Sequence, residues 1–206
     1  MSAGTRLPLA WAQDAARALM AMWRMPVDSC MVVGSVRRGK EDVGDLEFTA
    51  RMPVDRRHDE LFRAISPTIK AEGLFEGTTK TYGKALEGFK PGFKYCRLLM
   101  NLDRDGKEFE IPVQIHRYAH DEGNRGWIEI MRTGPEKFGP AFLRRWKEHH
   151  GIAAGRQASV DGHLVSSGGR IVAVRTEAIA FELCGMKFIE PQQRDAVCDH
   201  LQGHRS

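Results

Sequence analysis

Two acidic residues on one predicted strand, preceded by a glycine-serine turn, are the feature that most constrains this chain. The short apolar run Cys30-Met31-Val32-Val33 stops at Gly34-Ser35, which is how a buried strand ends in a tight turn. After nine intervening residues comes the sequence Asp45-Leu46-Glu47-Phe48. Because side chains alternate along a strand, Asp45 and Glu47 are expected to share one face, about 6 to 7 Å apart.

The residue types around this turn suit phosphate and a divalent cation. Mg²⁺ is usually held by one or two carboxylates, while substrate phosphates and waters complete its octahedron. The Gly34-Ser35 turn offers backbone N–H groups, close backbone approach and a hydroxyl. Arg37, Arg38 and Lys40 follow, and a guanidinium matches phosphate oxygens in geometry and charge. A surface turn followed by a solvated strand is the alternative, but the combination favours a phosphate and metal site.

The remaining pattern predicts an α+β protein. Helices are expected where apolar residues recur at helical spacing, and strands where short β-branched or alternating runs end at turn residues. The predicted helices are 9–23, 59–69, 127–132, 137–150 and 177–183, and the predicted strands are 30–33, 43–49, 95–100 and 108–117, with short alternating segments after 155. Residues 73–94 are predicted to form turns and a mobile hairpin. The strand over 43–49 is expected to carry Val43 on the face of the two acids.

The composition is that of an ordinary globular protein. Of 206 residues, 42% are hydrophobic and 28% are charged, so the chain can bury a core. The net charge of +4 permits a polyanionic partner without demonstrating one. No apolar run approaches the roughly 18 to 20 residues of a membrane helix, and the N-terminus lacks a secretory pattern, so a cytosolic location without membrane contact is expected. Four scattered cysteines indicate reduced thiols rather than disulfides or structural zinc.

The segment from Gly34 to Glu47 closely resembles the nucleotide-binding motif of the family X DNA polymerases, the DNA polymerase beta-like nucleotidyltransferases. Two further stretches are similar to that family: Arg132-Thr133-Gly134-Pro135 resembles its Thr-Gly-Ser turn, and residues 174–194 resemble its closing segment. The resemblance covers most of residues 9–198. It implies a nucleotidyltransferase palm over residues 1–120, a mixed β-sheet with flanking helices, and a small C-terminal α/β subdomain over 121–206 that binds the nascent base pair.

The same resemblance assigns roles at the site. Asp45 and Glu47 would bridge two Mg²⁺ ions, or Mn²⁺, one at a primer 3′-hydroxyl and one at the triphosphate. The nucleotide-binding residues would be Gly34, Ser35, Arg38, Gly44, Thr133 and Gly134. The implied substrates are a dNTP and a DNA primer-template. The implied enzyme is monomeric and adds a deoxynucleotide to a DNA 3′-end, with gap-filling repair as its setting.

The family's third carboxylate is missing from this chain. Counting back from Thr133-Gly134 by the family's spacing places His116 there as a catalytic residue, and a register shift of two places Gln114 there instead. An imidazole suits Mn²⁺ better than Mg²⁺, and an amide offers only a carbonyl oxygen. A structural role for His116 is an equal alternative. We therefore expect triphosphate binding to survive while turnover with Mg²⁺ is slow.

Three further expectations follow from the resemblance. The bond between Gly134 and Pro135 is predicted to be cis. The helix after it carries Lys137, Arg144, Arg145 and Lys147, which with Trp146 would meet a primer-template backbone, unless Trp146 packs inward behind a solvated face. Because only 33 residues precede Gly34, a minimal catalytic body without a lyase domain is expected, as in viral and phage enzymes of bacterial hosts.

Two other functions remain open at this point. The same core could transfer a nucleotide to another acceptor, namely RNA, a protein hydroxyl or a small molecule, because the core does not specify one. The chain could also be a nucleotide or DNA binding module weakened in catalysis by the lost carboxylate.

Overall fold

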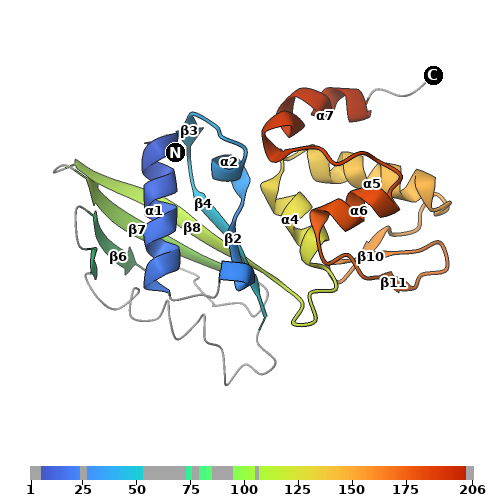
Figure 1. The fold of residues 1–206 in the computed structure, drawn as a ribbon, viewed down its shortest axis with the longest axis horizontal. Helices are drawn as coiled ribbons and strands as arrows, with labels where there is room; N and C mark the ends of the chain where they lie inside the picture. Colours follow the sequence, from blue (N-terminus) through green and yellow to red (C-terminus); the bar gives the residue numbers. More distant parts are fainter. Residues whose placement is uncertain are drawn as a thin grey trace. The chain divides into compact units, whose positions relative to one another are not determined.

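The computed structural model describes residues 6–23, 27–52, 73–75, 79–84, 95–104 and 107–202. The chain is α+β and divides into two compact units, Met1–Arg117 and Tyr118–Ser206 (Figure 1). The predicted helix at 59–69 and most of the predicted turns at 73–94 lie outside the described residues. Within the described parts, no helix combines the length and apolarity that crossing a membrane requires.

A six-stranded sheet with strand order β2-β4-β8-β7-β6-β5 forms the first unit. Its strands are β2 (Cys30–Val32), β4 (Leu46–Arg51), β5 (Gly73–Phe75), β6 (Thr79–Lys84), β7 (Tyr95–Arg104) and β8 (Lys107–Tyr118). Strands β7 and β8 form a long antiparallel hairpin, longer than the two predicted strands. The other elements are β1 (Leu7–Pro8), α1 (Leu9–Met22), the 3-10 helix η1 (Val27–Ser29), α2 (Gly34–Arg37) and β3 (Asp42–Val43), which pairs with β1.

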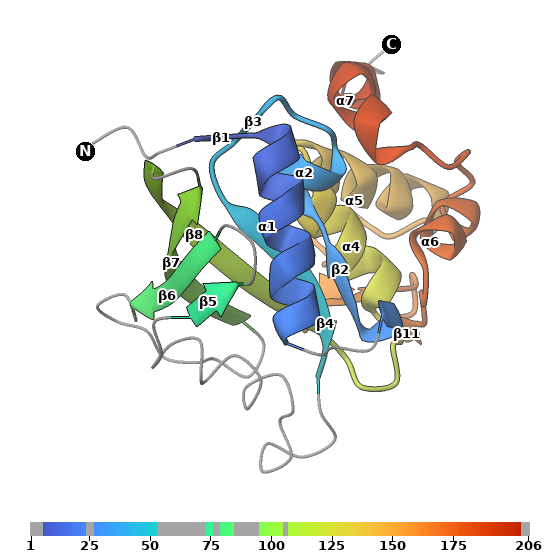
Figure 2. The ribbon, with the colours of Figure 1, turned by 60° about the vertical axis from the view of Figure 1, so that its left-hand side comes forward.

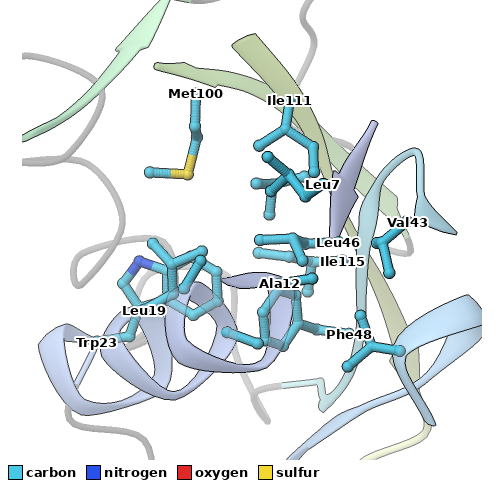
Figure 3. Close-up of a cluster of buried hydrophobic side chains, with 14 of the residues drawn as sticks. Leu7, Ala12, Leu19, Trp23, Val43, Leu46, Phe48, Met100, Ile111 and Ile115 are labelled. Atoms are coloured by element: carbon cyan, nitrogen blue, oxygen red, sulfur yellow. The ribbon is translucent and has the colours of Figure 1, made fainter. Parts of the chain in front are cut away.

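Helix α1 covers one face of this sheet (Figure 2) and contributes the helical half of the core. Leu19 is fully buried, and Trp23, just after the helix, meets Phe48 of β4 edge to face with 5.1 Å between ring centroids. Figure 3 shows these side chains converging with Leu46 and Ile115 from the strands. Burying each such large side chain contributes about 1.5–3 kcal/mol, so this layer fixes where β4 and β8 lie.

The prediction that Val43 shares a face with the two acids is wrong. Val43, Leu46 and Phe48 all belong to the same buried cluster (Figure 3). Strict alternation would put Val43 and Leu46 on opposite faces, since they are three residues apart. The strand is interrupted between β3 and β4, at Gly44 and Asp45. This interruption changes the alternation and places the Val43 side chain in the core. Glu47 stays on the opposite face from Leu46 and Phe48, as predicted.

The second unit packs four α-helices and a three-stranded sheet around an aromatic core. Its elements are α4 (Arg125–Thr133), α5 (Phe138–His149), β9 (Ser159–Val160), β10 (His163–Val165), β11 (Ile171–Val172), α6 (Glu177–Leu183), the 3-10 helix η3 (Pro191–Gln193) and α7 (Arg194–Gln202). The sheet order is β11-β10-β9. Helix α7 was not predicted from the sequence. The predicted cis bond between Gly134 and Pro135 is confirmed.

Trp146 belongs to this core and cannot meet a nucleic acid, so the inward-packing alternative is confirmed. Its side chain is fully buried, and its indole N–H donates to the carbonyl of Val165 at 2.8 Å. Lys137, Arg144 and Arg145 remain exposed on or beside α5. The exposed face of this helix therefore carries the predicted basic residues, but Trp146 is not part of it.

Candidate active site

Helix α2 begins directly where strand β2 ends, so the predicted Gly-Ser turn is one turn of helix. The amide of Val33 donates to the carbonyl of Glu47 at 2.9 Å, which ties the end of β2 to β4. The amides of Arg38 and Lys40 donate to the carbonyls of Gly34 and Ser35 at 3.2 and 3.1 Å and close the turn. This turn therefore lies beside the strand that carries Glu47.

Glu47 packs its carboxylate against the backbone of Gly34. A Cβ atom added to Gly34 would lie 2.2 Å from Oε2 of Glu47 and 3.0 Å from its carboxyl carbon. Gly34 also has φ +66°, a conformation that L side chains rarely adopt. Both space and backbone conformation therefore require glycine here, and the acid lies against the turn that the sequence predicted to bind phosphate.

Replacing Gly34 with alanine is expected to weaken nucleotide binding and to destabilise the protein by about 1–2 kcal/mol. The new methyl group would displace the Glu47 carboxylate, in addition to the backbone strain. Gly151→Ala is a matched control, since Gly151 has φ +61° and, apart from its chain neighbours, no atom of the described residues lies within 4 Å of an added Cβ. Chemical denaturation and nucleotide titration of both variants measure the two effects. Equal nucleotide affinity in the two variants would contradict the placement of Glu47.

Two side chains of β8 lie beside the acids: Gln114 contacts Asp45, and His116 is close to Glu47. Nε2 of Gln114 donates to Oδ2 of Asp45 at 2.6 Å. Nε2 of His116 lies 3.6 Å from Oε1 of Glu47. Both candidates for the third position are thus at the site: Gln114 is beside Asp45, and His116 is beside Glu47.

Strand β7 supplies two site residues that the sequence analysis missed. Tyr95 lies opposite His116 in the β7–β8 hairpin; their rings are 4.9 Å apart, and the Tyr95 hydroxyl donates to Oε1 of Gln114 at 2.9 Å. Arg97 lies opposite Gln114 and is exposed. The turn sequence Asp103-Arg104-Asp105-Gly106 was the signal that could have found them, because a short turn between two predicted strands sets how their residues pair.

Burial is the main cause that raises the pKa of Asp45 above its ordinary value of 3.8, and the charge of Glu47 raises it further. The Gln114 hydrogen bond and the charges of Arg97 and His116 act in the opposite direction without cancelling the rise. A partly buried carboxylate beside another acid is stabilised by any cation placed between them. The donor set of Asp45 and Glu47 thus fits a divalent cation whose remaining ligands come from a nucleotide.

In buffer without divalent cations, Asp45→Asn is expected to raise the free energy of unfolding at pH 7. The folded state disfavours the charged carboxylate, so the wild-type penalty is complete above the raised pKa and disappears as the pH falls below 3.8. Denaturant unfolding at several pH values should show the gain shrinking as the pH falls from 7 towards 4. A gain that grew on acidification would contradict the direction of the pKa shift.

The remaining predicted nucleotide contacts fall into two groups. In the first unit, the Ser35 hydroxyl oxygen is shielded from solvent and makes no hydrogen bond within the described ranges, while a Cβ added to Gly44 would meet nothing within 4 Å. A buried hydroxyl without a partner is rare in proteins, so Ser35 fits a ligand oxygen. Thr133, which is buried, and Gly134 belong to the second unit.

Among the residues that the structure describes, no three His, Cys, Asp or Glu side chains are grouped closely enough to hold a metal ion. A cation at this site would therefore be bound by the two carboxylates, Asp45 and Glu47, and by oxygen atoms of a bound nucleotide. Arg38 lies partly buried in the loop between α2 and β3, close to the Ser35 turn in the chain.

No protein-family model matches this chain. The chain is similar to DNA polymerase lambda of Rattus norvegicus, with 24% identity over 171 residues, which are 81% of the chain. The chain matches 28% of the length of that polymerase. This distant likeness supports a relationship to the family X DNA polymerases.

Proposed function

We propose that this chain is a DNA polymerase beta-like nucleotidyltransferase that transfers a deoxynucleotide from a dNTP to a DNA 3′-end. The observation that carries the proposal is the contact between the Glu47 carboxylate and the Gly34 turn, with Asp45 directly before the strand that carries Glu47. An acid pair on this turn is what a nucleotide with its cation requires. The distant likeness to DNA polymerase lambda agrees with this class of reaction.

Asp45 and Glu47 would hold Mg²⁺, or Mn²⁺, in this proposal. When bound, the cation neutralises phosphate charge and lowers the pKa of an attacking hydroxyl. The Ser35 hydroxyl and the Arg38 guanidinium would donate to phosphate oxygens of the triphosphate, and the open backbone at Gly44 would approach its end. In the transfer, the 3′-hydroxyl loses its proton to solvent and its oxygen forms a bond to the α-phosphorus. The bond between the α-phosphorus and the bridging oxygen breaks, and pyrophosphate leaves with that oxygen. The protein supplies alignment and charge neutralisation.

The larger organisation belongs to the same proposal. Residues 1–120 would be the palm and 121–206 the subdomain that binds the nascent base pair, with Thr133 and Gly134 near the nucleotide. The exposed Lys137, Arg144 and Arg145 would lie along the DNA backbone, where contacts are electrostatic and salt-dependent. The proposal also includes a monomeric state, a location in the cytoplasm of a bacterial host or phage-infected cell, and a role in gap-filling repair.

Primer extension tests the proposal against its rivals. The full chain is incubated with each dNTP on gapped, recessed and single-stranded DNA, with Mg²⁺ and with Mn²⁺, and with Asp45→Asn as the inactive control. Extension that follows the template supports the polymerase. Transfer to RNA, protein or a small molecule with no DNA product would favour the other acceptors, and nucleotide binding without pyrophosphate release would favour the binding module.

A further inference from the structure

We infer that Gln114 closes one of the two cation positions of this site, so that the protein binds its nucleotide with a single divalent cation. The inference rests on the proposed function, because it concerns the same acid pair. It departs from the two-ion arrangement that the family resemblance implies.

The first step is the hydrogen bond on Asp45. The Gln114 amide nitrogen lies 2.6 Å from Oδ2 of Asp45, so this oxygen already accepts a hydrogen bond from the protein. A cation at Oδ2 would have to share this oxygen with the amide N–H and would face the positive end of the amide dipole. This competition is expected to weaken cation binding at that oxygen.

The second step is the orientation of the amide. The Tyr95 hydroxyl donates to Oε1 of Gln114 at 2.9 Å, which leaves the NH₂ group facing Asp45. Turning the amide over would place Oε1 against the Asp45 carboxylate, two acceptors without a proton between them. The Tyr95 ring also packs against the His116 ring at a tilt of 30°, with 4.9 Å between centroids, so the tyrosine that orients the amide is itself held.

The third step concerns Glu47, whose carboxylate oxygens remain available to a cation. Glu47 makes no such bond with an amide in the described residues; its partner is His116, whose Nε2 lies 3.6 Å from Oε1. Its other oxygen, Oε2, lies against Gly34, at the turn proposed to bind phosphate. A cation that comes with the triphosphate therefore meets the Glu47 side of the pair, while the position beside Gln114 is occupied by a protein hydrogen bond.

Counting bound ions tests this directly. The wild-type chain, Gln114→Asp and His116→Asp are each equilibrated with Mn²⁺, a non-hydrolysable dNTP analogue and a recessed primer-template. Electron paramagnetic resonance counts bound Mn²⁺, and equilibrium dialysis counts bound nucleotide. We expect one Mn²⁺ per bound nucleotide in the wild type and in His116→Asp, and two in Gln114→Asp. Gln114→Glu replaces Gln114→Asp if the shorter acid prevents folding.

The outcomes separate the inference from the proposed function. Two ions per nucleotide in the wild type, one in both Gln114 variants, or two in His116→Asp would each overturn the assignment to Gln114 while leaving nucleotide binding intact. No nucleotide bound by any of the proteins would remove the proposed function, and the inference with it.

Discussion

Asp45→Asn is expected to lower the rate of nucleotide transfer on the order of 10³-fold, the effect of losing one electrostatic stabiliser of a phosphoryl transition state. The asparagine keeps the shape of the side chain and an oxygen that accepts from Gln114, but it loses the charge that pairs with a cation. Single-turnover insertion of one nucleotide measures the effect. The loss of rate should accompany the gain in stability predicted above, since the charge that serves transfer is the one that burial disfavours.

Asp42→Asn is the matched control for this change. Asp42 is an exposed aspartate on β3, three residues before Asp45. The substitution removes the same charge from the unit and leaves the Asp45 side chain in place. Its insertion rate should stay within about twofold of the wild type, as for an exposed charge that solvent screens. Equal losses in the two variants would trace the effect to net charge and not to the site.

Arg194→Ala is expected to destabilise the protein by about 3–5 kcal/mol, because it leaves a buried acid without its counter-charge. Arg194 is fully buried at the start of α7, and its guanidinium donates to Glu177 at 2.9 Å and to the carbonyl of Ile189 at 3.1 Å. It also lies 5.2 Å from the centroid of the Phe138 ring. Removing it would break a bond between α6 and α7 and open the aromatic core.

Denaturant unfolding, followed by tryptophan fluorescence, measures this loss. Arg145→Ala is the control, because Arg145 forms an ion pair with Glu148 at 3.1 Å between side chains that are 46% and 54% exposed. An exposed pair contributes about 0.2–1 kcal/mol. The double variant Arg194→Met with Glu177→Gln should recover part of the stability, since it leaves no buried charge. A cost for Arg194→Ala no larger than that for Arg145→Ala would refute the structural role of the buried pair.

Most of the elements were predictable because they depend on local sequence. The apolar run before Gly34 and the helix pattern after Leu9 are periodic signals that packing reinforces, and both elements formed where expected. The side of the sheet on which the Val43 side chain lies could not be predicted from the alternation of side chains along a strand. The interruption at Gly44 and Asp45 follows the pairing of β3 with β1, which lies much earlier in the chain, and no local pattern records this pairing.

The partners of the acids were harder to predict for the same reason. Counting residues back from Thr133 placed His116 at the third position, but the neighbour of Asp45 depends on how β8 lies beside β4, and loop lengths do not fix that alignment. The Arg194–Glu177 pair joins residues 17 apart, and no local pattern indicates that they meet. Buried ion pairs of this kind appear only once the surrounding core is known.

The central claim is that the acid beside the Gly34 turn holds a divalent cation together with a triphosphate. The most direct test is equilibrium binding of a non-hydrolysable dNTP analogue to the wild type and to Glu47→Gln, with Mn²⁺ and with EDTA. We expect wild-type binding that EDTA abolishes, and Glu47→Gln binding at least about tenfold weaker with Mn²⁺, as for a lost charged ligand. Nucleotide binding unchanged by EDTA and by Glu47→Gln would contradict the claim.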